Sequence, residues 1–332
     1  MPLNKVFLSA ALLLLSSCDK EPVDPQVPNS GSSVAILCEG TFQWNNASLD
    51  LWYPDSSKVV QGQFAKVNAR PLGDIAQSAL LTGNQLFVVV NNSGSVLKLN
   101  ANSLKLSHQN RELMSPRYAQ LWQGKLWVSD LYASKLTVLD TQSLSKVSES
   151  WARTWTEELT PWKGRLAVAE YQGQVALYNE EGQRVDSLST AKGCQELEVD
   201  PSGNLWVLNS DMDSGSSLMR IFPSGVRTTW SFQKVGISEL TLGPDGAYFL
   251  KGNTVMRMPF GASSTDECQQ WVSGPWSNAY SLQYLAKRQE FCLTDARDYV
   301  SKGRLFRLSL SGEILNQGDA CGVVPGFAIE LP

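Results

Sequence analysis

Three carboxylates end short apolar segments at positions from which they could meet at one site. Glu170, Asp211 and Asp295 each come at or just after the end of such a segment. If the segments are equivalent strands of a repeated unit, the carboxylates approach a common axis, where oxygen ligands suit a divalent cation that activates water. Asn91 and Lys251 occupy the equivalent positions of other units, which weakens this metal-dependent hydrolase hypothesis.

The remaining candidates for chemistry are weaker. His108, the single histidine, lies in a polar stretch that we expect to be an exposed outer strand, far from any nucleophile. Residues 209–215 resemble a calcium loop, but the glycine comes one residue late for an EF-hand and Arg220 stands where its glutamate belongs. A looser oxygen-ligand site around Asp211 stays open beside a simple solvated turn. We expect no catalytic residue, no metal and no cofactor, so the chain is predicted not to be an enzyme.

The elements that must position these residues recur about every forty residues. Each unit reads as an apolar strand, a glycine-centred turn, a second strand, a polar loop and a third strand, most clearly from Leu121 to Asp140. The successive turn glycines are Gly83, Gly124, Gly164, Gly203 and Gly246, which gives steps of 41, 40, 39 and 43 residues. A period of this length with several strands per unit is typical of a β-propeller.

Two further units without the glycine bring the count to seven. The first unit, from Val34 to Tyr53, has no innermost strand, whereas Phe327 to Leu331 forms an isolated strand at the end of the chain. We therefore predict an all-β protein, a seven-bladed β-propeller over residues 34–332, with its C-terminal strand closing the ring in the first blade. Closure removes exposed sheet edges.

Loops between second and third strands, and loops leading into innermost strands, open on the same face of such a ring. We expect that face to bind a ligand, because amide groups can hydrogen-bond a polar ligand and aromatic rings offer flat contact area. Arg117 or Arg297 could meet a phosphate. Each residue could instead only shape its turn. The candidates are Trp44, Asn45, Asn46, Asn91, Asn92, Arg117, Tyr118, Asp130, Tyr132, Glu170, Tyr171, Gln195, Asn209, Asp211, Trp276, Asn278, Tyr280, Asp295 and Arg297.

The N-terminus has the pattern of a targeting segment. Lys5 precedes an apolar run that is too short to span a bilayer, and the run ends in Leu15-Ser16-Ser17-Cys18. This end resembles the lipobox of bacterial lipoproteins, which implies a signal peptide over residues 1–17 and lipidation of Cys18; an ordinary secretory signal is the alternative. Residues 18–33 are predicted to be a flexible tether. The Asp19-Lys20-Glu21 tract resembles surface-export signals of Bacteroidetes, so the expected location is the outer membrane, lipid-anchored and facing the cell surface.

The net charge argues against one class of partner, and the cysteine count limits the possible disulfides. A net charge of −4 without a basic run argues against nucleic acid. Besides Cys18 there are five cysteines, so at least one thiol stays unpaired. Cys38 and Cys321 flank the predicted point of closure and could form a disulfide that latches the ring.

A family resemblance rests on two motifs. Glu39-Gly40-Thr41-Phe42, followed by Asn46-Ala47-Ser48-Leu49 and Tyr53, resembles the opening of the YncE-like propeller lipoproteins of Bacteroidetes, and Ser115-Pro116-Arg117-Tyr118 is similar to another recurrent element of that group. The resemblance implies a seven-bladed surface lipoprotein that captures a ligand, with cobalamin as the candidate, and passes it to a TonB-dependent outer-membrane transporter. An interaction scaffold or adhesin without a small ligand remains the alternative, and a metal-dependent propeller hydrolase or lactonase the second.

Overall fold

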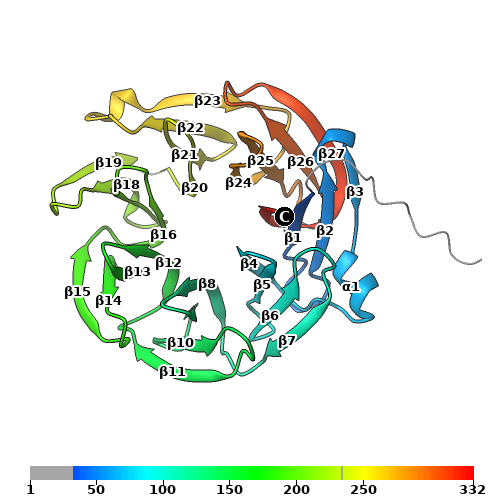
Figure 1. Cartoon of the computed structure of the whole chain (residues 1–332). Coiled ribbons are helices and arrows are strands. Elements are labelled where there is room, and N and C mark those ends of the chain that lie inside the picture. The colour runs from blue at the N-terminus through cyan, green and yellow to red at the C-terminus, as the bar shows by residue number, and fades with distance from the viewer. Residues whose placement is uncertain (1–32, 233–234) are drawn as a thin grey trace, which may run out of the picture. The chain divides into compact units, whose positions relative to one another are not determined.

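The chain forms seven four-stranded antiparallel sheets, arranged as blades around a central axis, in a computed structural model (Figure 1). The structure describes residues 33–332 apart from residues 233 and 234, and it leaves the side chains of residues 319 and 320 undescribed. This architecture confirms the predicted seven-bladed β-propeller. The predicted signal peptide, Cys18 and the tether up to residue 32 lie outside the described residues.

Each blade runs from an innermost strand at the axis to a polar outer strand. From the axis outward, blade 1 holds β28 (Pro325–Glu330), β1 (Val34–Cys38), β2 (Ser48–Tyr53) and β3 (Lys58–Val60); blade 2 holds β4 (Ala76–Thr82), β5 (Gln85–Val90), β6 (Ser95–Asn100) and β7 (Leu106–Asn110); blade 3 holds β8 (Pro116–Trp122), β9 (Lys125–Asp130), β10 (Lys135–Asp140) and β11 (Lys146–Trp151); blade 4 holds β12 (Thr156–Trp162), β13 (Arg165–Glu170), β14 (Gln174–Tyr178) and β15 (Arg184–Ser189).

The second half of the ring repeats this order. Blade 5 holds β16 (Cys194–Val199), β17 (Leu205–Asp211), β18 (Gly215–Ile221) and β19 (Arg227–Phe232); blade 6 holds β20 (Ile237–Leu242), β21 (Gly246–Lys251), β22 (Thr254–Pro259) and β23 (Gln269–Ser273); blade 7 holds β24 (Ala279–Leu285), β25 (Glu290–Asp295), β26 (Lys302–Leu308) and β27 (Ile314–Val323). A short helix α1 (Gln63–Asn68) links blades 1 and 2, and single 3₁₀ turns η1 (Pro54–Ser56) and η2 (Thr265–Glu267) lie in blades 1 and 6. Within the described ranges, no helix is long and apolar enough to cross a membrane.

Burial explains which sequences become which strands. Second and third strands such as β5 and β6 are buried on both faces, because neighbouring blades cover them, and they read as continuous apolar runs. Outer strands such as β11 and β7 face solvent and are polar. His108 lies exposed on β7, as predicted.

Tight turns join the innermost and second strands. Gln123 and Gly124 both have positive φ, 49° and 69°, and Lys163 and Gly164 repeat the pattern, as a type I′ hairpin turn requires. The expectation fails at Gly246, which is the first residue of β21 and not a turn glycine. A Cβ there would lie 2.4 Å from the carbonyl oxygen of Met258, so close approach of two strands accounts for this glycine.

The last strand closes the ring. β28 pairs with β1 along registers such as Val34 with Glu330 and Leu37 with Phe327, which makes it the innermost strand of blade 1 as predicted. Apolar clusters then fill the space between neighbouring blades: one contains Trp127 together with Val168 of blade 4, and another contains Trp206 together with Phe249 of blade 6. These large side chains thus hold blade to blade.

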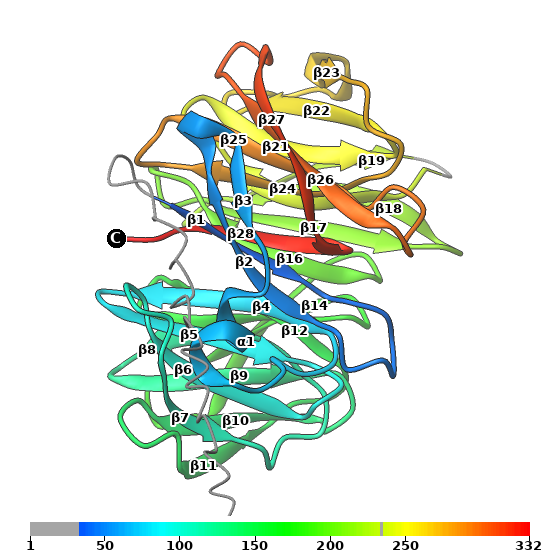
Figure 2. The same ribbon diagram turned by 90° about the vertical axis from the view of Figure 1, so that its right-hand side faces the viewer.

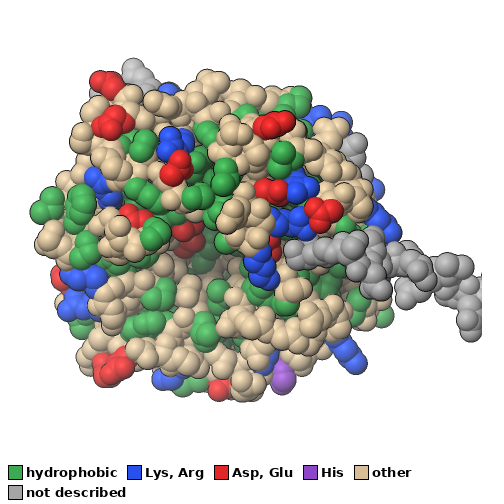
Figure 3. Space-filling model, turned by 45° about the horizontal axis from the view of Figure 1, so that its top comes forward, with side chains coloured by type: hydrophobic (Ala, Val, Ile, Leu, Met, Phe, Trp, Pro, Cys, Tyr) green, Lys and Arg blue, Asp and Glu red, His purple; other side chains and the backbone are tan. Residues whose placement is uncertain are grey.

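Strand direction gives the ring two distinct faces. The loops that follow each second strand and the loops that lead into each innermost strand lie on one face, which we call the loop face. The chain ends on the other side of the ring from the loop between β1 and β2 (Figure 2). Viewed obliquely from the side where the chain ends, the molecule is hollowed near the middle of the ring, with acidic side chains at the edge of the hollow (Figure 3).

Candidate functional site

A cavity of about 670 Å³ lies on the axis of the ring. Its wall comes mainly from the innermost strands, and it reaches the loop face at Phe42, Asn91 and Tyr299. We call it the axial cavity. Such a volume is usual for a small-molecule site.

Equivalent positions of three successive blades place glutamates in this cavity. Glu158 is the third residue of β12, Glu196 the third of β16 and Glu239 the third of β20. All three strands carry a β-bulge at this point, and β4, β8 and β24 have the same irregularity. Since a bulge re-aims the side chains beside it, the bulges fix how these glutamates meet the axis.

Two of the glutamates also connect neighbouring blades. Glu158 Oε2 accepts a hydrogen bond from the backbone N–H of Leu197, at 2.8 Å, in the next blade. Glu196 accepts from the N–H of Glu239 at 3.0 Å and from that of Leu240. These carboxylates therefore stabilise the inner ring as well as giving the cavity its acidic character.

Burial makes these carboxyl groups hard to ionise. It raises the pKa of Glu196 to about 7 and, together with the nearby Glu196 charge, raises the pKa of Glu198 to about 8. The pKa values of Glu158 and Glu239 lie well above the usual range, first through burial and then through neighbouring carboxylates. The axial cavity consequently gains negative charge as the pH rises through neutrality.

Arg117 is the one cation that lines the cavity among the described residues. Its Nε lies 2.8 Å from Glu157 Oε2, and its Nη1 donates to Gln77. Glu39, opposite, accepts from the Tyr280 hydroxyl at 2.9 Å. Since Glu157 already neutralises Arg117, the cavity keeps an excess of acidic groups.

The predicted face residues divide into three groups, and the first lines the axial cavity. Its members are Asn91, Arg117, Tyr118, Gln195 and Tyr280. A second group is exposed on the loops: Trp44, Asn45, Tyr132 and Arg297. These two groups are available to a ligand or a partner.

The third group shapes turns or packs inside. Asp130 accepts from the N–H groups of Tyr132, Ala133 and Ser115 at 2.9 Å each. Trp276 is buried against Phe306, and its indole N–H donates to a backbone carbonyl. Comparable bonds within loops or strands occupy Asn46, Asn92, Glu170, Tyr171, Asn209, Asp211, Asn278 and Asp295.

The carboxylates suggested for a metal do not meet at the axis. Glu170, Asp211 and Asp295 are absent from the lining of the axial cavity and bind their own turns or a neighbouring arginine or lysine. In the part of the chain that the structure describes, no group of three or more His, Cys, Asp or Glu side chains is arranged to hold a metal ion.

The acidic lining of the axial cavity was not predicted from the sequence. Glu158, Glu196, Glu198 and Glu239 were not singled out, and Glu39 was named only as part of a family motif. The signal was present, because Glu158, Glu196 and Glu239 each stand six or seven residues ahead of the repeat glycines 164, 203 and 246. Aligning innermost strands on those glycines would have shown carboxylates recurring within one residue of the same position.

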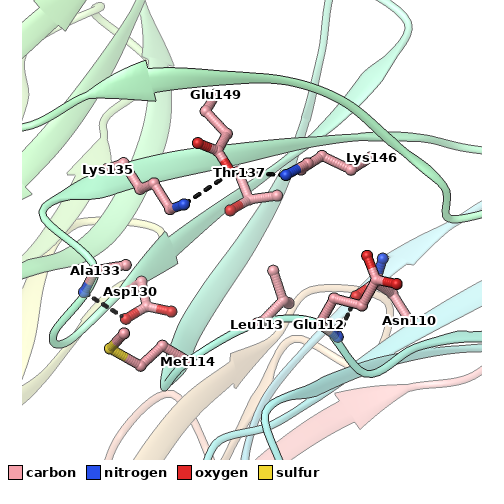
Figure 4. A pocket seen from close by; sticks show the side chains of 10 residues that line it. All are labelled: Asn110, Glu112, Leu113, Met114, Asp130, Ala133, Lys135, Thr137, Lys146 and Glu149. Atoms are coloured by element: carbon pink, nitrogen blue, oxygen red, sulfur yellow. Dashed lines mark hydrogen bonds and ion pairs between the residues drawn. The ribbon is translucent and has the colours of Figure 1, made fainter.

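A second cavity, of about 290 Å³, lies between blades 2 and 3 (Figure 4). Lys135 and Lys146 point toward it, but both bind Glu149, at 2.7 and 3.0 Å. Asp130, on its wall, binds the backbone of Ala133. Its two lysines and Asp130 are thus already paired, and the larger axial cavity is the better candidate.

Comparison with solved structures supports the fold. A quinoprotein alcohol dehydrogenase-like protein from Bacteroides thetaiotaomicron is similar with a TM-score of 0.71 and 14% identity, over 90% of this chain and 78% of that one. A Lactobacillus plantarum protein gives 0.65 and 13%, over 91% and 99%, and streptogramin B lyase gives 0.61 and 11%, over 74% and 82%. No protein family model and no curated protein matches the chain. These identities show a shared propeller fold and nothing finer.

Proposed function

We propose that this protein is a binding protein that captures a small molecule in the axial cavity and releases it to a transporter in the outer membrane. The observation that carries the proposal is the cavity itself, about 670 Å³, open at the loop face and walled by side chains from all around the ring. Its lining combines acceptors such as Gln195 and Glu239 with aromatic rings such as Tyr118 and Tyr280. Because most of the lining is polar, the cavity suits a ligand that carries many hydrogen-bonding groups.

Cobalamin is the ligand proposed first, on the family resemblance. Its peripheral carboxamides donate N–H groups that carboxylate and amide oxygens of the lining can accept. Arg117 is bound to Glu157 and Gln77, so a phosphate must compete for it. We propose the lipid anchor at Cys18 and the cell-surface location as the setting in which capture and hand-off occur.

The three carboxylates that suggested a hydrolase do not line the axial cavity. Glu170, Asp211 and Asp295 hold turns, and His108 lies on an outer strand. The scaffold alternative is favoured by one observation, the exposed apolar side chains on the loop face.

The proposal is tested by titrating cobalamin into the protein that lacks residues 1–18, with calorimetric detection. We expect one-to-one binding, weakened about tenfold or more when Tyr280→Ala removes an aromatic wall of the cavity. Trp151→Ala, at an exposed aromatic residue on the outer strand β11 and outside the cavity, is the matched control and should bind normally. Absence of heat at high cobalamin concentration would rule cobalamin out, and equal loss in both variants would place the site elsewhere.

A further inference from the structure

Apolar side chains are exposed unevenly on the two faces of the ring. Those on loops of the loop face are Phe42, Trp44, Met114, Tyr132, Met212, Val235, Tyr299 and Val300. Among the described residues, loops of the opposite face expose only Val226 and Leu310 as large apolar side chains. Exposed apolar groups gathered on one side of a molecule mark an interaction surface.

The kinds of residue on the loop face are those found in interface cores. Trp44 is 72% exposed and Tyr132 70% exposed, and Met212 is fully exposed. Tryptophan and tyrosine dominate binding energy at interfaces, and methionine is enriched there. A surface that only needed to stay soluble would not hold these residues at its loop tips.

The loops that present these side chains are held in place by carboxylates, of which Asp74, Asp130 and Asp211 are buried and Asp298 is exposed. Asp130 fixes the backbone of Tyr132, and Asp74 accepts from the N–H of Gln43, at 2.8 Å, next to Trp44. Asp211 accepts from the N–H groups of residues 213 and 214, beyond Met212, and Asp298 accepts from the N–H of Val300 at 3.1 Å. Rigid loops lose little entropy on binding, so these apolar tips are preorganised for contact.

Charge complementarity indicates what the partner brings to the centre of this surface. The loop face surrounds the mouth of the axial cavity, which Glu39, Glu158, Glu196, Glu198 and Glu239 line. The cation on its wall, Arg117, is paired with Glu157. A lysine or arginine that enters the cavity favours the ionised form of these carboxyl groups, so a partner gains most by carrying positive charge there.

We propose that the loop face is a docking surface for a protein partner, whose apolar surface covers the exposed loop tips while a lysine- or arginine-bearing loop enters the axial cavity. This inference rests on the proposed function in one respect, because it names the chemistry of the partner that receives the ligand. A basic loop in the cavity would also compete with the ligand for the same space, so docking and release are coupled.

The test selects phage-displayed, disulfide-closed peptide loops on the immobilised full-length protein in detergent. We expect the selected loops to share a lysine or arginine next to aromatic or aliphatic residues. Their affinity should fall about tenfold or more in a Trp44→Ser/Tyr132→Ser variant and in a Glu158→Gln/Glu239→Gln variant. Higher salt should weaken the same binding.

Matched controls lie on the opposite face. Val226→Ser/Leu310→Ser removes exposed apolar groups, and Glu313→Gln removes an exposed carboxylate, so neither should change the affinity. Three outcomes would each overturn the proposal. The selected loops could lack basic residues, they could bind the loop-face variants as well as the unchanged protein, or no loop could be enriched. Cobalamin binding is measured separately, by calorimetry. A failure of the proposed ligand capture can therefore be distinguished from a failure of the proposed docking.

Discussion

At the scale of single residues, the unusual feature is a set of carboxyl groups gathered at the axis. Glu198 is the clearest case, because burial and the Glu196 charge raise its pKa to about 8. In the unfolded chain its pKa returns to the ordinary value near ~4.3. Between these values the folded protein binds a proton that the unfolded chain has lost, so stability falls as the pH rises from about 4 to 8.

Replacing this carboxyl group should remove part of that pH dependence. We expect Glu198→Gln to raise the free energy of unfolding at pH 9 by about 1–3 kcal/mol and to change it little at pH 4. Thermal unfolding across this pH range checks the expectation. Glu313→Gln, at an exposed position, should follow the unchanged protein, and a Glu198→Gln curve parallel to the unchanged protein would contradict the assignment.

At the scale of elements, carboxylates that seemed suited to chemistry prove to organise loops. Asp130 ends β9 and binds three backbone N–H groups, two in the following loop and one in the loop leading into β8. Its side chain is buried, so removing it leaves those donors without their acceptor. A similar arrangement recurs at Asp295, the last residue of β25, which accepts from two backbone N–H groups in the loop leading into β24 and one in the following loop.

The cost of losing such a carboxylate can be measured directly. We expect Asp130→Ala to lower the free energy of unfolding by about 1–3 kcal/mol in urea denaturation. Asp186→Ala is the control, because Asp186 is exposed and its ion pair with Arg165 is long, at 3.7 Å, so little change is expected. Equal effects of the two substitutions would show that the hydrogen bonds of Asp130 do not stabilise the loops.

At the scale of the whole molecule, the ring is joined where blade 7 meets blade 1. Cys38 on β1 and Cys321 on β27 lie in one buried cluster there, and Cys292 is part of it. Burial, followed by contact with Cys321, raises the pKa of the Cys38 thiol well above its usual value. Both thiols are reduced in the structure, so the latch stays a prediction.

Refolding in a glutathione redox buffer tests that latch. Thiol–disulfide exchange with one glutathione disulfide should oxidise the Cys38 and Cys321 thiols to a disulfide. The two electrons and two protons that the thiols lose convert the glutathione disulfide into two molecules of glutathione. Non-reducing mass spectrometry of peptides should detect the link, and the melting temperature should rise relative to Cys321→Ser. Detection of a Cys38–Cys292 link, or of five free thiols, would contradict this pairing.

The sequence was enough to predict the ring but only part of the site. Period and alternation predicted the blades and the closing strand, because burial between blades demands continuous apolar strands such as β5 and β13. They could not separate a turn-forming aspartate such as Asp130 from a ligand-binding one, since both follow a strand. Glu196 was missed because a glutamate on a strand normally indicates a solvent-exposed position. Only the assembled ring surrounds this residue with other blades.

The pairing of β28 with β1 has a consequence for the timing of synthesis. Strand β1 is among the first segments of the propeller to leave the ribosome, yet its inner neighbour is made last. Until then the backbone of β1 lacks hydrogen-bond partners on its axial side, and the apolar side chains of blade 1 lack their cover. During translation the nascent protein therefore exposes an unpaired strand edge, which is prone to aggregation until β28 has been made.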